Sequence, residues 1–155
     1  MFDTAVRNVM RRRDLIKAPP TLRVAAAAQR MAKKNVGAIV VMERERVVGI
    51  FTERDIVFRV IARGLDPATT HVGEAMTPAP HTIGPDEPFG HGLLVMHDKR
   101  FRHLPVVEDG KLLGIVSARS ALDPDLEEFV AEAQRRRFLR AELARKRRSA
   151  AHAPD

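Results

Sequence analysis

Gly49-Ile50-Phe51-Thr52-Glu53-Arg54-Asp55 is followed 65 residues later by a second version of itself, Gly114-Ile115-Val116-Ser117-Ala118-Arg119-Ser120. Each version runs from an apolar, strand-forming segment to a hydroxyl residue and then into a pattern that opens a helix. They differ at the last position, where the first has a carboxylate and the second a hydroxyl. The repetition predicts the fold, and this difference bears on function.

The repeat extends well beyond this stretch. Residues 20–55 align with residues 85–120 without a gap, and Asn8-Val9-Met10 resembles Glu74-Ala75-Met76 at an offset of 66. We therefore predict two copies of one unit. The first copy spans residues 4–65 and the second spans residues 72–122.

Each copy is expected to form, in order, helix, strand, helix, strand, strand and helix. A short helix ends at Met10 or Met76, and Thr21 and Asp86 are expected to cap the long helices. Asp109-Gly110 marks a hairpin turn. One copy would expose too much apolar strand, so two copies are expected to cover each other's sheets. In the first copy, strands are expected at 15–17, 38–42 and 47–51, a long helix at 21–34 and a turn at 43–46. In the second copy, a strand is expected at 81–83 and a long helix at 86–99.

Composition limits the class of protein. The 155 residues, 45% of them hydrophobic, are enough to bury a core, and the absence of cysteine excludes disulfides and thiolate metal sites. Residues 1–13 are charged and lack the apolar segment of a signal peptide. No stretch reaches the ~18 apolar residues of a membrane span. We predict a cytoplasmic protein without a transmembrane segment.

The net charge of +7 is concentrated near the C-terminus, because residues 135–148 hold eight basic residues and one acid. Acidic residues at 125–128 precede them, a polarity that suits a helix dipole. We predict a basic C-terminal helix at 123–149 and a disordered tail at 150–155. Its role stays open between a solvated face, contact with a protein partner or second protomer, and binding to nucleic acid or an anionic membrane.

Thr52 and Asp55 are the first candidates for chemistry. Where a strand turns into a helix at Thr52, unpaired N–H groups favour an anion such as a phosphate. Asp55, one turn later, could accept hydrogen bonds from a ribose diol. The same residues also fit a relative of the capping box, with Thr52 as N-cap. The two interpretations are compatible, since a cap can also contact a ligand.

Several motifs together resemble a tandem pair of cystathionine beta-synthase (CBS) domains, or Bateman module, of the small stand-alone bacterial type. The resemblance covers about residues 4–122. Any one motif is weak, but their double occurrence in one register is specific. The motifs are Asn8-Val9-Met10, Glu74-Ala75-Met76-Thr77-Pro78, Arg102-His103-Leu104-Pro105-Val106-Val107 and the repeated Gly-Ile-(Phe/Val)-(Thr/Ser)-x-Arg-(Asp/Ser).

The resemblance implies an α+β fold of two pseudo-symmetric units, each a three-stranded sheet with two helices, packed sheet to sheet. It also implies a homodimer and a cleft for AMP, ADP, ATP or S-adenosylmethionine as a regulatory ligand. We therefore expect a regulatory module that is not an enzyme and requires no cofactor. The alternative is a dimerisation scaffold whose basic segment binds nucleic acid or a protein partner.

Carried onto this chain, the family pattern places ribose at Asp55, phosphate near Thr52 and the base beside Ile50. Arg102 and His103 of the second copy would reach the phosphates, although they could also be exposed residues at a strand start. The full expected ligand set is Ile50, Thr52, Arg54, Asp55, His81, Arg102, His103 and Arg119.

The second cleft departs from the pattern. It would be formed by Gly37, Ala38, Ser117 and Ser120. Ser120 cannot accept a diol as a carboxylate does, and Gly37-Ala38 stand where the second copy has a basic pair. We therefore expect one competent site in each chain. The histidines show no metal-site spacing, so no metal site is predicted.

Overall fold

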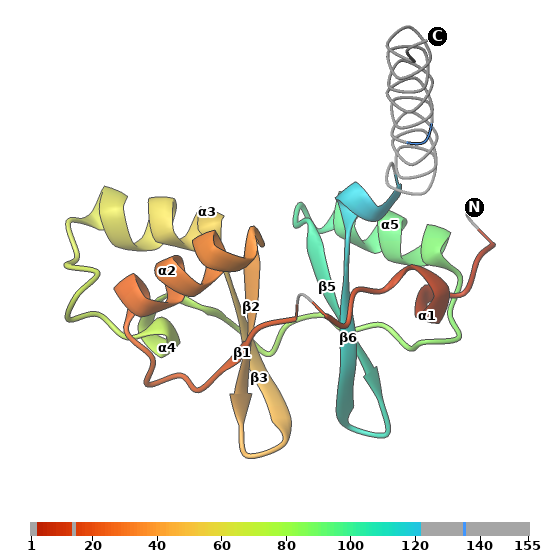
Figure 1. The fold of residues 1–155 in the computed structure, drawn as a ribbon, viewed down its shortest axis with the longest axis horizontal. Coiled ribbons are helices and arrows are strands. Elements are labelled where there is room, and N and C mark those ends of the chain that lie inside the picture. The colour runs from red at the N-terminus through yellow and green to blue at the C-terminus, as the bar shows by residue number, and fades with distance from the viewer. Residues whose placement is uncertain (1–2, 14, 122–134, 136–155) are drawn as a thin grey trace, which may run out of the picture. The chain divides into compact units, whose positions relative to one another are not determined.

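The computed structural model describes residues 3–13, 15–121 and 135. The chain divides into an N-terminal unit, Met1–Ala118, and a C-terminal unit, Arg119–Asp155. The N-terminal unit contains two sheets with helices beside them (Figure 1), and the predicted α+β class of paired units is confirmed. The predicted basic helix and tail lie outside the described residues, apart from Arg135, which is helical and exposed.

The elements follow the predicted order in the first copy, but the strand predicted at 81–83 in the second copy is wrong. Only Ile83 forms a bridge there, and the strand of this region is β4, which pairs with the first sheet. The first copy forms α1 (Val6–Val9), β1 (Lys17–Ala18), α2 (Val24–Lys34), β2 (Ala38–Glu43), β3 (Arg46–Thr52), α3 (Glu53–Asp55), a π-helical turn η1 (Ile56–Val60) and a 3-10 turn η2 (Ile61–Arg63). The second forms α4 (Val72–Ala75), β4 (Thr77–Pro78), α5 (Phe89–Asp98), β5 (His103–Glu108), β6 (Lys111–Ser117) and a 3-10 turn η3 (Ala118–Ala121).

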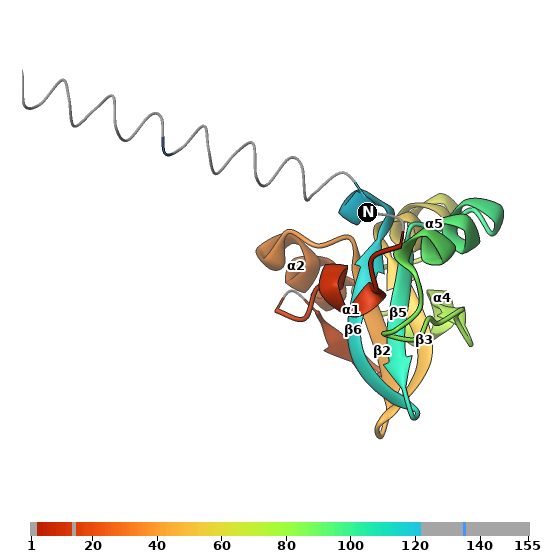
Figure 2. The ribbon, with the colours of Figure 1, turned by 90° about the vertical axis from the view of Figure 1, so that its right-hand side faces the viewer.

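Each sheet is centred on a hairpin, β2–β3 or β5–β6, whose turn lies at the same end of the fold (Figures 1 and 2). Asp109 and Gly110 both have positive φ, at 49° and 77°, as expected for their two-residue turn. The predicted four-residue turn of the first hairpin is shorter, because Glu43 and Arg46 pair with each other and belong to the strands.

The outer strands show how the two copies are joined. Strand β1 runs parallel to β2, and β4 runs antiparallel to β3, so the first sheet has four strands where three were expected. In the second sheet the equivalent positions are single bridges, Ile83 to Val106 and Arg11 to Ile115. Strand β4 and Arg11 each follow the short helix of one copy and pair with the sheet of the other.

The short helices cross over in the same way. Helix α1 lies against α5 of the second copy, and α4 lies against β3 and η1 of the first (Figure 1). Val6 and Val72, which open these two helices, are fully buried. An ion pair of 2.6 Å joins Arg7 to Asp86 and holds the pKa of that carboxyl below its usual range. The predicted copy boundaries describe the sequence repeat, while the packing units interlock.

The two long helices begin later than predicted. Helix α2 starts at Val24 and α5 at Phe89, so neither Thr21 nor Asp86 is an N-cap. The opening N–H groups instead donate to backbone carbonyls of the crossing segments, Val24 to Thr70 (3.0 Å) and Phe89 to Thr4 (2.8 Å). These bonds satisfy donors that a side-chain cap would otherwise serve. A local cap pattern could not reveal acceptors so distant in sequence.

The core of the first copy includes residues from the crossing helix α4. Phe51 and Ile39 of the hairpin are fully buried, and Val72 and Ala75 of α4 belong to the same cluster. This helix is therefore part of the core that stabilises the first sheet. The helices in the described part of the chain are all too short or too polar to span a bilayer.

Two glycines allow the crossing segments to approach the hairpins. A Cβ at Gly49 would overlap the sulfur of Met76, and one at Gly114 would lie 3.0 Å from both the Arg11 carbonyl oxygen and the Met10 sulfur. Both positions therefore need a residue without a side chain if the crossing segments are to pack this closely.

We expect Gly114→Ala to lower the free energy of unfolding by about 1–3 kcal/mol, because the Arg11 backbone would have to move away from β6. Chemical denaturation followed by circular dichroism measures this change. Gly84→Ala is the control, since its Cβ would meet only the side chain of Glu87. Equal stability of the Gly114→Ala and control proteins would contradict the close approach.

Candidate functional site

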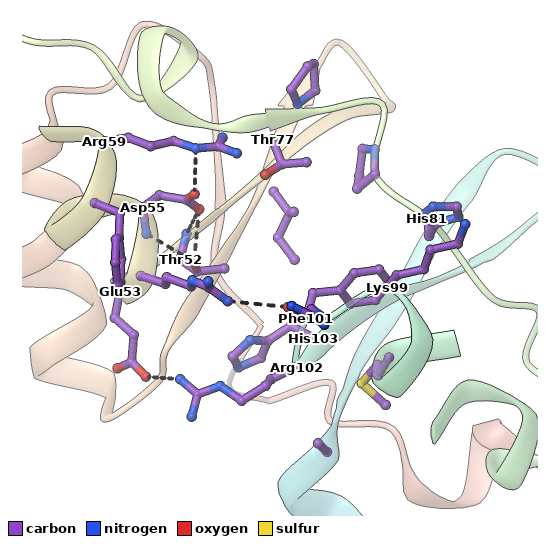
Figure 3. Close-up of a pocket in the computed structure, with 18 of the residues that line it drawn as sticks. Thr52, Glu53, Asp55, Arg59, Thr77, His81, Lys99, Phe101, Arg102 and His103 are labelled. Atoms are coloured by element: carbon purple, nitrogen blue, oxygen red, sulfur yellow. Dashed lines mark hydrogen bonds and ion pairs between the residues drawn. The ribbon is translucent and has the colours of Figure 1, made fainter. Parts of the chain in front are cut away.

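A pocket of about 1210 Å³ lies in the N-terminal unit, between the end of β3 with its following helix and the α5–β5 junction (Figure 3). Residues from both copies line it, as does the crossing segment around Thr77–Ala79. The volume exceeds the ~300–1,000 Å³ typical of small-molecule sites. The pocket has room for a ligand of nucleotide size.

Thr52 and Asp55 form a capping box at the wall of the pocket. One oxygen of Asp55, Oδ2, accepts hydrogen bonds from the Thr52 N–H (2.8 Å) and hydroxyl (2.9 Å) (Figure 3). The Asp55 N–H donates to the Thr52 hydroxyl oxygen at 3.4 Å. The capping interpretation is therefore confirmed. Asp55 is buried, with 8% of its surface exposed, yet it lines the pocket, so capping leaves ligand contact open.

Arg59 holds the other oxygen of the same carboxylate. Its Nε lies 3.4 Å from Asp55 Oδ1 (Figure 3), and its Nη1 donates to the carbonyl oxygens of Ala75 (3.2 Å) and Met76 (2.8 Å). Those carbonyls lie at the end of helix α4. One guanidinium thus links the first copy's pocket wall to the crossing segment.

The opposite wall is the α5–β5 junction, and its sequence differs from that of the first copy. Residues 34–38 read Lys-Asn-Val-Gly-Ala, whereas residues 99–103 read Lys-Arg-Phe-Arg-His. Phe101 stacks on His81, with ring centroids 5.7 Å apart. The second copy therefore presents a flat aromatic surface and additional basic side chains where the first has small or neutral ones.

Two basic side chains bridge the walls. Arg102 forms an ion pair of 3.1 Å with Glu53 (Figure 3), and both side chains are more than half exposed. Arg54 donates from Nη1 to the Arg100 carbonyl oxygen at 3.4 Å, with its guanidinium 5.2 Å from the ring centre of Phe58. An exposed ion pair such as Arg102–Glu53 stabilises a protein by only about 0–1 kcal/mol. A bound anion could therefore displace Glu53 from Arg102.

The lining is strongly basic. It includes six arginine and lysine side chains but only the two carboxylates Glu53 and Asp55. Such a surplus favours a ligand with negative charge, and aromatic and aliphatic groups in the same pocket favour one with a flat apolar part. The basic residues are Arg54, Arg59, Arg63, Lys99, Arg100 and Arg102, with His81, His97 and His103 beside them.

Most of the predicted ligand residues line this one pocket. Arg119 is absent from the lining and belongs to the C-terminal unit. Contact between the predicted residues and a ligand stays a prediction. The residues that share the pocket are Ile50, Thr52, Arg54, Asp55, His81, Arg102 and His103.

The sequence reasoning missed four residues of interest. Arg59 follows Asp55 by four positions, and this helical spacing could have identified it. Lys99, Arg100 and Phe101 precede the predicted basic pair directly, so the whole basic and aromatic run could have been included.

The four residues of the predicted second cleft are largely engaged in the backbone framework. The Gly37 carbonyl oxygen accepts from the Glu53 N–H at 3.1 Å, and Ala38 is buried and pairs with Thr52 in the sheet. Ser117 pairs with His103 in the β5–β6 hairpin. Ser120 is buried and belongs to the C-terminal unit. The expectation of one competent site stays a prediction. Within the described part of the chain, no three His, Asp or Glu side chains could hold a metal ion together.

Comparison with known proteins places this geometry in a family. The CBS domain family model matches residues 6–62 and 72–125. An uncharacterised protein of Methanopyrus kandleri is 34% identical over 72% of this chain and 58% of its own length. The chain spans 58%, 19% and 55% of three of the curated relatives that it matches.

Solved structures agree with this match. An uncharacterised conserved protein from Pyrococcus horikoshii has a TM-score of 0.74 and 30% identity, over 81% of this chain and 94% of its own. A CBS domain protein from Pyrobaculum aerophilum, solved in complex with AMP, has a TM-score of 0.69 and 26% identity over 76% and 89% of the two chains.

A substitution of Arg100 can test whether the pocket keeps a basic residue in an unfavourable backbone conformation. Its φ of 59° is left-handed, as is that of Asn35 (52°) at the equivalent position, but asparagine tolerates this conformation better. Arg100→Asn should therefore raise the free energy of unfolding by up to about 1 kcal/mol. It should also weaken binding of inorganic pyrophosphate several-fold, because a basic side chain is lost.

Denaturation and calorimetry measure these two effects. Arg44→Asn is the matched control, because Arg44 has a φ of 53° in the first hairpin turn and does not line the pocket. It should stabilise the fold and leave pyrophosphate binding unchanged. If both variants bind pyrophosphate equally well, Arg100 is not an anion contact.

Proposed function

The chain belongs to the CBS domain family, and on this premise we propose that it is a regulatory module, not an enzyme, that binds an adenine nucleotide in the Asp55 pocket. Tandem CBS domains are typically regulatory modules. The observation that carries the proposal is that one pocket combines a buried carboxylate with a basic wall from the other copy. The related protein from Pyrobaculum aerophilum, solved with AMP, supports the same ligand class.

The ribose is assigned to Asp55. Its Oδ2 is fixed by Thr52, which leaves Oδ1, with its single contact to Arg59 at 3.4 Å, able to accept further hydrogen bonds. Hydrogen bonds to an ionised carboxylate are worth about 1.5–3 kcal/mol each. A ribose diol offers two such donors, which makes Asp55 the main determinant for a nucleoside in this proposal.

The phosphates are assigned to the α5–β5 junction, where Lys99, Arg100 and Arg102 line the pocket. Arg102 would exchange the Glu53 carboxylate for a phosphate. The basic surplus favours AMP, ADP or ATP over S-adenosylmethionine, whose sulfonium adds a positive charge to an already positive pocket. Adenine would lie near Ile50 and the stacked rings of His81 and Phe101, where an aromatic face is available.

Signalling would follow from differential binding. A nucleotide can shift the protein between two conformations only by binding one of them more tightly. Because the pocket is lined by both copies and by the crossing segment, closure around a nucleotide would bias their arrangement. A partner protein would then recognise the altered surface.

We expect Asp55→Asn to weaken AMP binding at least tenfold, because a neutral amide accepts the ribose hydroxyls less strongly. Ser120→Ala should leave the affinity unchanged, since the second cleft is proposed to be incompetent. Isothermal titration calorimetry on nucleotide-free protein, with AMP, ADP, ATP and S-adenosylmethionine at two salt concentrations, measures both effects. The phosphorylated nucleotides should lose affinity at higher salt.

Equal loss in the two variants would refute the proposal of one competent site. Absence of heat with every nucleotide would refute nucleotide sensing. It would favour the second candidate, a dimerisation scaffold whose basic residues 135–148 bind nucleic acid or a protein partner.

We also propose that the protein forms a homodimer through exposed apolar side chains of η1, of η2 and the loop directly after it, and of α5. Large apolar side chains there are 43–64% exposed, which is a typical sign of an interaction surface. A second protomer is the occupant that the family assignment favours. The residues of this surface are Val57, Phe58, Ile61, Leu65 and Leu94.

Ile61→Asp is expected to convert the dimer to a monomer, because a carboxylate would be buried without a partner at the interface. Ile61 does not line the pocket, so nucleotide binding provides a check on folding. Light scattering after size-exclusion chromatography measures the mass. Lys33→Asp, on the exposed face of α2, is the control and should remain dimeric. A monomeric unmodified protein would refute the homodimer.

A further inference from the structure

We propose that Arg59 is a positioning residue that orients the Asp55 carboxylate and links it to the crossing segment Ala75–Ala79. Through this link, occupancy of the pocket would change the stability of the connection between the two copies. The part of the inference that concerns a bound nucleotide rests on the proposed function. The link itself is a property of the ligand-free protein and can be tested separately.

The Asp55 carboxylate is held from two sides. Thr52 holds Oδ2 through its N–H and hydroxyl, and Arg59 Nε faces Oδ1 at 3.4 Å. The Asp55 side chain is only 11% exposed, compared with 38% for that of Arg59. A charge so well shielded from water needs a compensating partner. Arg59 supplies that partner and at the same time limits rotation of the carboxylate.

The same guanidinium reaches the crossing segment. Nη1 donates to the carbonyl oxygens of Ala75 (3.2 Å) and Met76 (2.8 Å), where helix α4 ends. Carbonyls at the end of a helix lack intrahelical donors, so these two bonds satisfy groups that would otherwise need water. The planar guanidinium has donors at fixed angles and can therefore connect both sites at once, which a lysine ammonium does less well.

The crossing segment is itself part of both the sheet and the pocket. Directly after Met76, β4 pairs with β3 at Gly49 and Ile50. The Ala79 N–H then donates to the Val48 carbonyl oxygen at 3.0 Å. Residues 77–79 also line the pocket. A shift of Arg59 would therefore also move β4, the strand that pairs with β3 and joins the two copies.

Arg59 also lies in the π-helical turn η1, whose closing bonds run from the Ile61 N–H to the carbonyls of Ile56 and Val57. Such wide turns are rare and often occur at functional sites. Here the turn allows Arg59 to face both the Asp55 carboxylate and the end of α4.

Amide hydrogen exchange on the full chain without ligand tests the link. The reporters are the Met76 N–H, bonded to Val72, and the Ala79 N–H, bonded to Val48. In Arg59→Gln both should exchange at least fivefold faster than in the unmodified protein. In the control Arg30→Gln, on the exposed face of α2, both should be unchanged. Unchanged exchange in Arg59→Gln would overturn the link.

Calorimetry and exchange with AMP test the coupling. In the unmodified protein, AMP should slow exchange of both reporters. Arg59→Lys should bind AMP within about threefold of the unmodified affinity, because the positive charge is kept. Both reporters should nevertheless exchange fast in this variant, even with saturating AMP. Arg59→Gln should bind about tenfold more weakly. If Arg59→Gln binds as tightly as the unmodified protein, Arg59 does not position Asp55.

The two readouts separate the possible failures. If the unmodified protein binds no AMP, the proposed function fails, and the exchange rates without ligand still decide whether Arg59 holds the crossing segment. If AMP binds but protects the reporters equally in the lysine variant, the guanidinium is not the link and the inference is overturned. Should Arg59→Gln not fold, Arg59→Lys carries both measurements.

Discussion

The reciprocal crossing of backbone between the two copies is the constraint on which the rest of the structure depends. Thr70 and Thr4 provide the carbonyls that accept from the first N–H groups of α2 and α5, and β4 and Arg11 extend the opposite sheets. Fully buried Val72 and Val6 anchor the two crossing helices. Because these acceptors lie outside the copy that holds the donors, neither copy can satisfy its backbone alone. The two copies are therefore expected to fold together.

This interlocking also explains why a pocket forms between copies that have diverged. The framework needs glycines at 49 and 114 and apolar residues in the hairpins, and both copies keep them. The α5–β5 junction differs from its counterpart in the first copy and carries Arg100, Phe101 and Arg102. Asp55 in the first copy and this junction in the second make one pocket with both polarities. The positive φ of Arg100 is a backbone conformation that an arginine adopts at some cost in energy.

Asp55 has a structural role that would also prepare it for the proposed ligand. It closes the capping box with Thr52, so it stabilises the turn from strand to helix whether or not a ligand is present. Its second oxygen faces Arg59, which in turn holds the end of α4. A preformed network of this kind lowers the entropic cost of ordering the site when a ligand binds. Through Arg59, the crossing segment is also only one side chain away from the Asp55 carboxylate.

The sequence by itself determined the duplication, the order of elements, the hairpins and the family, because these follow from local periodicity and from a repeat that can be aligned with itself. It also identified Thr52, Asp55, Arg102 and His103 as residues that share one pocket. Only the tertiary structure decided how the copies exchange their short helices, why Thr21 and Asp86 are not caps, and what Arg59 contacts. These features depend on hydrogen bonds between segments far apart in sequence, and no local pattern records which backbone carbonyl will lie beside which donor.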